Sequence, residues 1–92
     1  MKEFWMHPAK IQLRGFSEGE ILRALKKAEE FKAEIVKTEN GIDLFFEDVE
    51  NARLFVSKLQ KEFRFEKKMS TENLGFKRGR MRFLFVYSLR KI

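Results

Sequence analysis

The sequence predicts a small α+β domain of ferredoxin-like character, with two helices covering one face of an antiparallel sheet. Apolar residues recur at helical spacing in two segments and alternate with polar residues in five others. These segments follow one another in the order β-α-β-β-α-β-β. The first six form the split βαβ arrangement, and the last strand is expected to add a hairpin partner to the fourth. At 92 residues, the chain is expected to form a single domain, 1–92.

The first strand and helix are predicted from a simple alternation followed by a capping signal. Apolar and polar residues alternate from Ala9 to Arg14, which is typical of a half-buried strand. Ser17-Glu18-Gly19-Glu20 then matches a capping box, in which the Ser17 and Glu20 side chains each bond the other residue's amide. The first helix is therefore expected from about Glu18 to Lys32.

A hairpin and a second helix follow. Ala33 to Thr38 reads as a short strand, and Asn40-Gly41 predicts a tight turn because both residues accept positive φ. Alternation from Ile42 to Glu47 predicts the returning strand. The second helix should begin at about Asp48, and its apolar stripe consists of Ala52, Phe55, Val56, Leu59 and Phe63.

The C-terminal part of the chain is predicted to hold two further strands separated by a loop. The period changes to two from Phe63 to Met69, and Ser70 to Gly79 is expected to be a polar loop. The last strand, Met81 to Arg90, is apolar on both faces at its centre, so it should lie inside the sheet or meet another chain. The residues expected to be largely buried are Ile11, Leu13, Ile21, Leu25, Leu44, Phe55, Leu59, Phe65, Phe83 and Phe85.

Composition argues against an enzyme. The absence of cysteine excludes disulfides and thiolate metal sites, and a single histidine, His7, excludes a histidine cluster. Adjacent carboxylates such as Glu29-Glu30 do not face each other on a helix, so they make poor acid–base pairs. We therefore expect no catalytic residue, no cofactor, no metal and no small-molecule substrate. Without a signal peptide or apolar span, the chain is expected to be cytoplasmic, and its abundant Lys and Glu resemble thermophile usage.

The net charge of +6 is concentrated in the C-terminal half. Residues 53–92 carry twelve bases and three acids, whereas residues 17–52 carry five bases and ten acids. A cationic field of one sign favours anionic partners, and nucleic acid is the commonest of these. Stacking is not the expected mechanism, because Phe45 alone would stand on the open face of the strands that RNA-binding sheets use. The predicted nucleic-acid-binding residues are Lys10, Arg14, Arg64, Lys68, Lys77, Arg78, Arg80, Arg82 and Arg90.

Two other interpretations of these features stay open. The cations could form a solvated surface that maintains solubility and discourages strand-edge aggregation. The apolar last strand, together with Phe4 and Trp5, could instead make the chain a protein-interaction or homodimerisation module.

Several short segments resemble a known family. They are Ile11-Gln12-Leu13-Arg14-Gly15, Gly41-Ile42-Asp43-Leu44-Phe45, Ala52, Gly79-Arg80-Met81-Arg82-Phe83 and Val86-Tyr87-Ser88-Leu89-Arg90. Together they are similar to the domain that follows the zinc-binding segment in the large-ribosomal-subunit export adapters, the nonsense-mediated-decay-three proteins and their archaeal relatives. The resemblance implies binding to the large ribosomal subunit during its maturation and no enzymatic activity. We therefore expect the chain to bind ribosomal RNA, or a ribosomal protein–RNA surface, by electrostatics. The Cys-x-x-Cys pairs that precede this domain in the family do not occur here.

Overall fold

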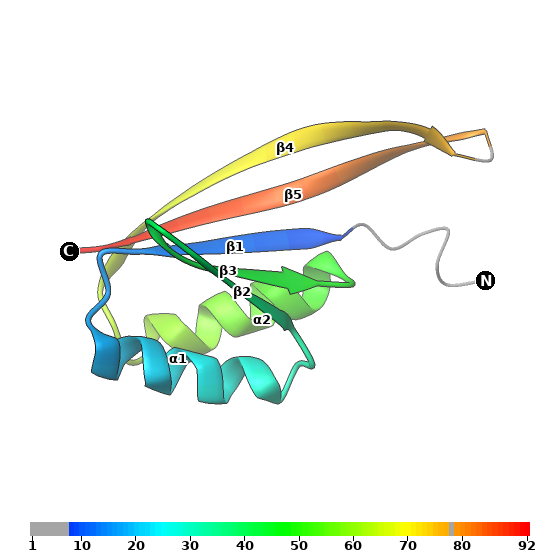
Figure 1. Cartoon of the computed structure of the whole chain (residues 1–92). Coiled ribbons are helices and arrows are strands. Elements are labelled where there is room, and N and C mark those ends of the chain that lie inside the picture. The colour runs from blue at the N-terminus through cyan, green and yellow to red at the C-terminus, as the bar shows by residue number, and fades with distance from the viewer. Residues whose placement is uncertain (1–7, 78) are drawn as a thin grey trace.

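The computed structural model describes residues 8–77 and 79–92, and for Lys77 and Arg80 it describes the backbone alone. His7, Phe4, Trp5 and Arg78 thus lie outside the described residues. The fold is α+β, with two helices and a five-stranded sheet (Figure 1). Its elements are β1 (Ala9–Arg14), α1 (Glu18–Glu29), β2 (Glu34–Thr38), β3 (Gly41–Phe46), α2 (Val49–Gln60), β4 (Phe65–Lys77) and β5 (Arg80–Lys91).

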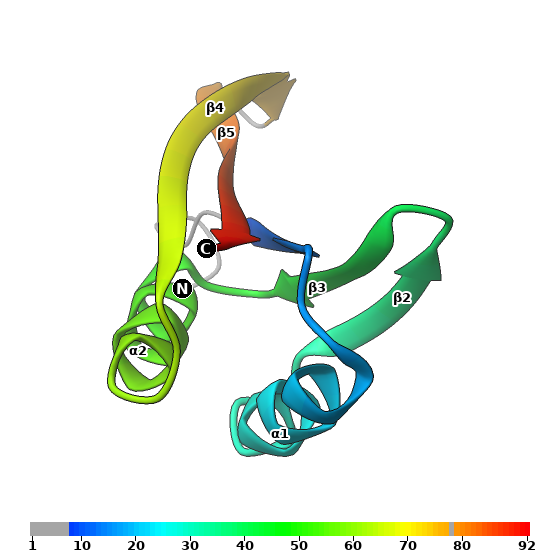
Figure 2. The ribbon, with the colours of Figure 1, turned by 90° about the vertical axis from the view of Figure 1, so that its left-hand side faces the viewer.

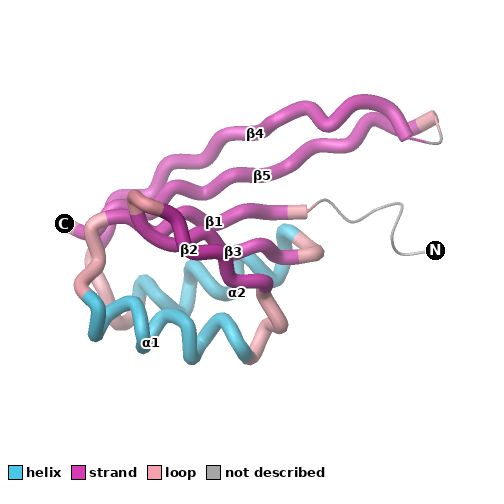
Figure 3. The backbone as a smooth tube through the Cα atoms, viewed as in Figure 1, coloured by secondary structure: helices cyan, strands magenta, loops and turns pink. Residues whose placement is uncertain are grey.

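The sheet is mixed, and its strand order differs from the predicted one. The order is β2-β3-β1-β5-β4, and Figure 3 shows β1, β5 and β4 side by side in this order. The prediction of a wholly antiparallel sheet is wrong at one place, because β1 and β5 run parallel. A ferredoxin-like order would place the strand after the second helix beside β1. Here β4 forms the edge instead and β5 lies between it and β1, so the ferredoxin-like topology is not confirmed.

Both helices lie on one face of the sheet, as predicted (Figures 1 and 2). Between them and the strands is an apolar core. Half of the ten predicted core residues are fully buried, namely Ile11, Leu13, Leu44, Phe55 and Leu59. The other five, Ile21, Leu25, Phe65, Phe83 and Phe85, are only partly buried.

The local signals at the helix starts are confirmed. The Ser17 hydroxyl accepts a hydrogen bond from the Glu20 amide (3.3 Å), and the Glu20 carboxylate accepts one from the Ser17 amide (2.8 Å). Asp48 caps α2 by accepting from the Glu50 amide at 2.6 Å. α1 ends at Glu29 rather than at Lys32, because the chain turns there and Lys32 takes a positive φ of 57°.

The expected loop from Ser70 to Gly79 is wrong, because β4 continues as a strand to Lys77. Polar residues and glycine predict a loop, but these residues pair with β5, and a bulge accommodates one extra residue. Asn73 pairs with Phe83 and Gly75 with Arg82, so Leu74 is an extra residue on β4. The Asn73 side-chain oxygen accepts from the Gly75 amide at 2.7 Å and supports this bend.

The distal part of the β4–β5 hairpin projects beyond the rest of the sheet (Figure 1). Ala9, the first residue of β1, pairs with Phe85, so the β5 residues before Phe85 have β4 as their only strand neighbour in the described structure. We call the hairpin residues 71–77 and 79–84 the arm. It lengthens the molecule to 43 Å, against 23 and 21 Å in the other directions.

Candidate nucleic-acid interface

Several predicted cations share the open face of the sheet, the face away from the helices. Side chains alternate along a strand, and Ile11 and Leu13 point into the core, so Lys10 and Arg14 point to the open side. Arg14 pairs with Arg90 in the parallel β1–β5 register. Lys68 joins them from β4, where it lies opposite Ser88.

Arg14, however, is engaged within the sheet. Its guanidinium forms an ion pair with Asp43 at 2.9 Å and donates to the Leu13 and Ile42 carbonyls. The side chains of Arg14 and Asp43 are only 19% and 12% exposed. This contact links β1 to β3, so the guanidinium has little capacity left for a phosphate.

The open face carries mixed charge rather than a continuous positive field. Asp43, Glu66 and Glu72 share it, and Glu66 lies directly opposite Arg90. Lys10 is half-buried, and its ammonium lies 6.0 Å from the centre of the Phe45 ring. The middle of this face is therefore a weaker phosphate-binding surface than the sequence suggested.

The remaining predicted cations fall at opposite ends of the long hairpin. Arg64 is exposed just before β4, and its carbonyl accepts from the Ile92 amide, which places it near Arg90. Arg82 belongs to the arm, about 26 Å along β5 from Arg90 at the usual rise per residue. The backbone puts Lys77 and Arg80 at the far end of the arm, and Arg78 lies outside the described residues. Only a large ligand could contact both ends of the β4–β5 hairpin at once.

A groove between α2 and the helix-side surface of β4–β5 was missed by the sequence reasoning. Its volume is about 360 Å³, and its lining residues are Arg53, Val56, Ser57, Gln60, Lys67, Met69 and Tyr87. The Nε of Arg53 donates to the Tyr87 hydroxyl at 3.0 Å, and this bond raises the pKa of Arg53. The lining holds two cations and no carboxylate. The one sequence signal for this groove was Lys67, a cation that the alternation along β4 places on the helix side of the sheet.

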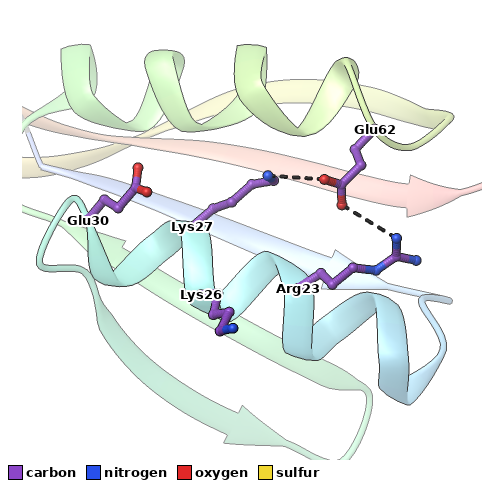
Figure 4. Close-up of a pocket in the computed structure, with 5 residues that line it drawn as sticks. All are labelled: Arg23, Lys26, Lys27, Glu30 and Glu62. Carbon is purple, nitrogen blue, oxygen red and sulfur yellow. Dashed lines mark ion pairs between the residues drawn. The ribbon is translucent and has the colours of Figure 1, made fainter.

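A second depression, between the two helices, is a structural ion-pair site. Figure 4 shows Lys27 and Arg23 of α1 both directed at Glu62, which follows α2. The distances are 3.1 Å from Lys27 and 3.8 Å from Arg23. Because the Glu62 carboxylate bonds both cations of α1, the arrangement links the two helices.

Among the described residues, no group of three or more His, Asp or Glu residues is arranged to hold a metal ion. Among the same residues, no helix is long and apolar enough to span a bilayer.

The fold and these surfaces define a small α+β domain with a mixed sheet, a projecting hairpin and a basic C-terminal half. The chain belongs to the NMD3 family, because the family model for the second domain of NMD3 matches residues 8–90. This confirms the resemblance to the export adapters, a family associated with the large ribosomal subunit. No curated protein sequence matches the chain.

Proposed function

We propose that this chain is a non-enzymatic, cytoplasmic domain that binds the large ribosomal subunit by electrostatic contact with ribosomal RNA. Membership of the NMD3 family supports the partner. The observation that carries the mode of binding is the arm, which extends a narrow ribbon away from the sheet. In the sequence, four cations fall within the six residues 77–82, namely Lys77, Arg78, Arg80 and Arg82, and we call these the arm cations. The described backbone places Lys77 and Arg80 at the far end of the arm.

A projecting ribbon suits structured RNA because it can approach phosphates that a flat surface cannot reach. Guanidinium groups bind phosphate oxygens through two parallel hydrogen bonds. The central open face contributes less, since Arg14 is paired with Asp43 and Glu66 faces Arg90. We therefore assign the main contact to the arm, with Arg64, Lys68, Arg90 and Lys10 as secondary positions.

The test is binding to large ribosomal subunits over a range of salt concentrations. Each neutralised phosphate contributes a log–log slope of about −0.7 to −0.9, so replacing the four arm cations by Ala should flatten the slope by roughly 2–3 units. The matched control replaces four exposed lysines that form no ion pair with a described residue: Lys26, Lys32, Lys37 and Lys61. Lys27 is left out of the control because it pairs with Glu62.

The control variant loses the same net charge and should keep most of the slope. Equal weakening by both variants would mean that total charge alone governs binding. Binding of the arm variant as tight as wild type, or failure of the wild type to bind subunits, would reject the proposed contact.

A further inference from the structure

The outer edge of β4 has no neighbouring strand among the described residues, because β4 ends the sheet. Its first nine residues, 65–73, pair with β5 in unbroken register before the bulge. A strand of this length exceeds the usual five or six residues. The free N–H and C=O groups along its edge can accept another strand.

Exposed apolar side chains gather on the same hairpin. Met69, Leu74, Phe76 and Met81 are all exposed, Phe76 to 73%. The arm itself is a two-stranded ribbon, and an isolated hairpin is only marginally stable in water. A third strand beside β4 would both cover apolar surface and support the arm.

We propose that two copies of this chain associate through their β4 edges, antiparallel, about a twofold axis at Ser70. The result is a continuous sheet in which the partner strand is a second β4. This assembly does not rest on the ribosomal contact proposed above, and it takes Lys68 from the secondary positions of that contact.

Symmetry limits the registers that this edge can adopt. A twofold axis perpendicular to the sheet keeps every side chain on its own face. Directly opposed residues must point to the same face, so the axis has to pass through a residue position. On β4, the open face carries Glu66, Lys68, Ser70 and Glu72.

Charge selects among the allowed registers. With the axis at Ser70, Lys68 of each copy lies opposite Glu72 of the second copy, which gives two ion pairs. An axis at Met69 sets Glu66 against Glu72 twice, and an axis at Lys68 sets that lysine against itself. An axis at Thr71 makes no charged pair. Only the Ser70 register among these four gains attraction without repulsion.

The same register explains the arm. Because Leu74 is the extra residue of the bulge, residues 71–77 of one copy would run beside residues 64–69 of the other. Each arm thereby acquires a third strand, which is the part of the second copy's β4 that borders the groove of Lys67 and Met69. Lys68 then becomes an interface residue rather than an RNA-binding one.

Charge reversal tests the register in buffer without nucleic acid. Lys68→Glu and Glu72→Lys, singly, should each weaken dimerisation about tenfold or more in sedimentation equilibrium, because both ion pairs become repulsions. The double exchange restores opposite charges and the net charge, so its dimerisation should return to the wild-type level. A monomeric wild type at micromolar concentration, or a double exchange no tighter than the single variants, would overturn the proposal.

Disulfide trapping gives a second, independent readout, since the native chain has no cysteine. Ser70→Cys should cross-link readily on mild oxidation, because residues opposed across a strand pair lie about 4.5–5.5 Å apart at Cα, within disulfide reach. Met69→Cys tests the neighbouring register, and Ser57→Cys on α2 is the exposed control. Ser70→Cys cross-linking no faster than either of these would reject the twofold axis at Ser70.

Discussion

The guanidinium of Arg14 and the carboxylate of Asp43 form a 2.9 Å ion pair on the open face of the sheet, and both side chains are largely shielded from water. The pair joins β1 to β3 across 29 positions of the sequence. The ion pair of Lys58 and Glu30 is different, because its side chains are 51% and 62% exposed.

Asp43→Ala should therefore lower the free energy of unfolding by about 1–3 kcal/mol, because it leaves a shielded guanidinium without its partner. Glu30→Ala is the matched control and should cost no more than about 0.5 kcal/mol, since an exposed ion pair contributes little. Chemical denaturation measures both. Equal costs would show that water screens the Arg14–Asp43 pair as fully as the exposed one.

Gly41 is predicted to be the least replaceable glycine of the chain. Its φ is +150°, and a Cβ placed there would overlap the backbone carbonyl oxygen of Leu13. Gly41→Ala should cost about 2–4 kcal/mol, because neither atom can move without disturbing the β1–β3 pairing. Gly19→Ala in α1 is the opposite case: nothing lies within 4 Å, and the change should stabilise the helix by about 0.5–1 kcal/mol. A Gly41→Ala variant as stable as wild type would refute the close approach.

Phe55 is the largest fully buried side chain among the described residues. It is fully buried, and its ring centre lies 5.4 Å from that of Phe46 and 6.2 Å from that of Phe31. Phe55→Ala should cost about 3–5 kcal/mol through lost burial and the cavity left behind. Leu54→Ala, at an exposed position of the same helix, should change stability by less than about 1 kcal/mol. Thermal unfolding of the two variants compares them, and a small effect at Phe55 would contradict the packing described.

The local elements could be predicted because their signals lie within a few residues of each other. The capping box at Ser17 marks the start of one helix, and the apolar stripe around Phe55 marks the buried face of the other. The turn after Thr38 was also placed correctly, although Glu39 and Asn40 form its loop and Gly41 already pairs with Thr38. In the Asn40-Gly41 pair, only Gly41 has a positive φ.

The neighbours in the sheet could not be predicted, because alternation gives the faces of a strand and not its partners. β5 is apolar on both faces, and its interior position is confirmed, but nothing in its residues distinguishes a parallel neighbour from an antiparallel one. The same limit applies to the predicted binding residues, because their partners depend on which strands are neighbours. Alternation places Arg14 on the open face as a surface cation, but its ion pair with Asp43 depends on the pairing of β1 with β3, which alternation does not give.

The capping box at the start of α1 should make stability depend on pH. The pKa of Glu20 is lowered, first by the hydrogen bond from the Ser17 amide and further by Lys91, whose ammonium lies 3.3 Å from the carboxylate. A carboxylate with a lowered pKa in the folded state stabilises the fold fully above its ordinary value of 4.5, and this contribution is lost as the pH falls through the folded value.

Glu20→Gln should consequently be less stable than wild type at neutral pH, and the difference should shrink as the pH falls below 4.5. Lys91→Met removes only the smaller cause, so its pH dependence should lie between those of wild type and Glu20→Gln. Urea denaturation at a series of pH values provides the measurement. Parallel curves for wild type and Glu20→Gln across the acid range would mean that the folded state does not favour the ionised carboxylate, and the helix start would then depend on the Ser17 hydroxyl alone.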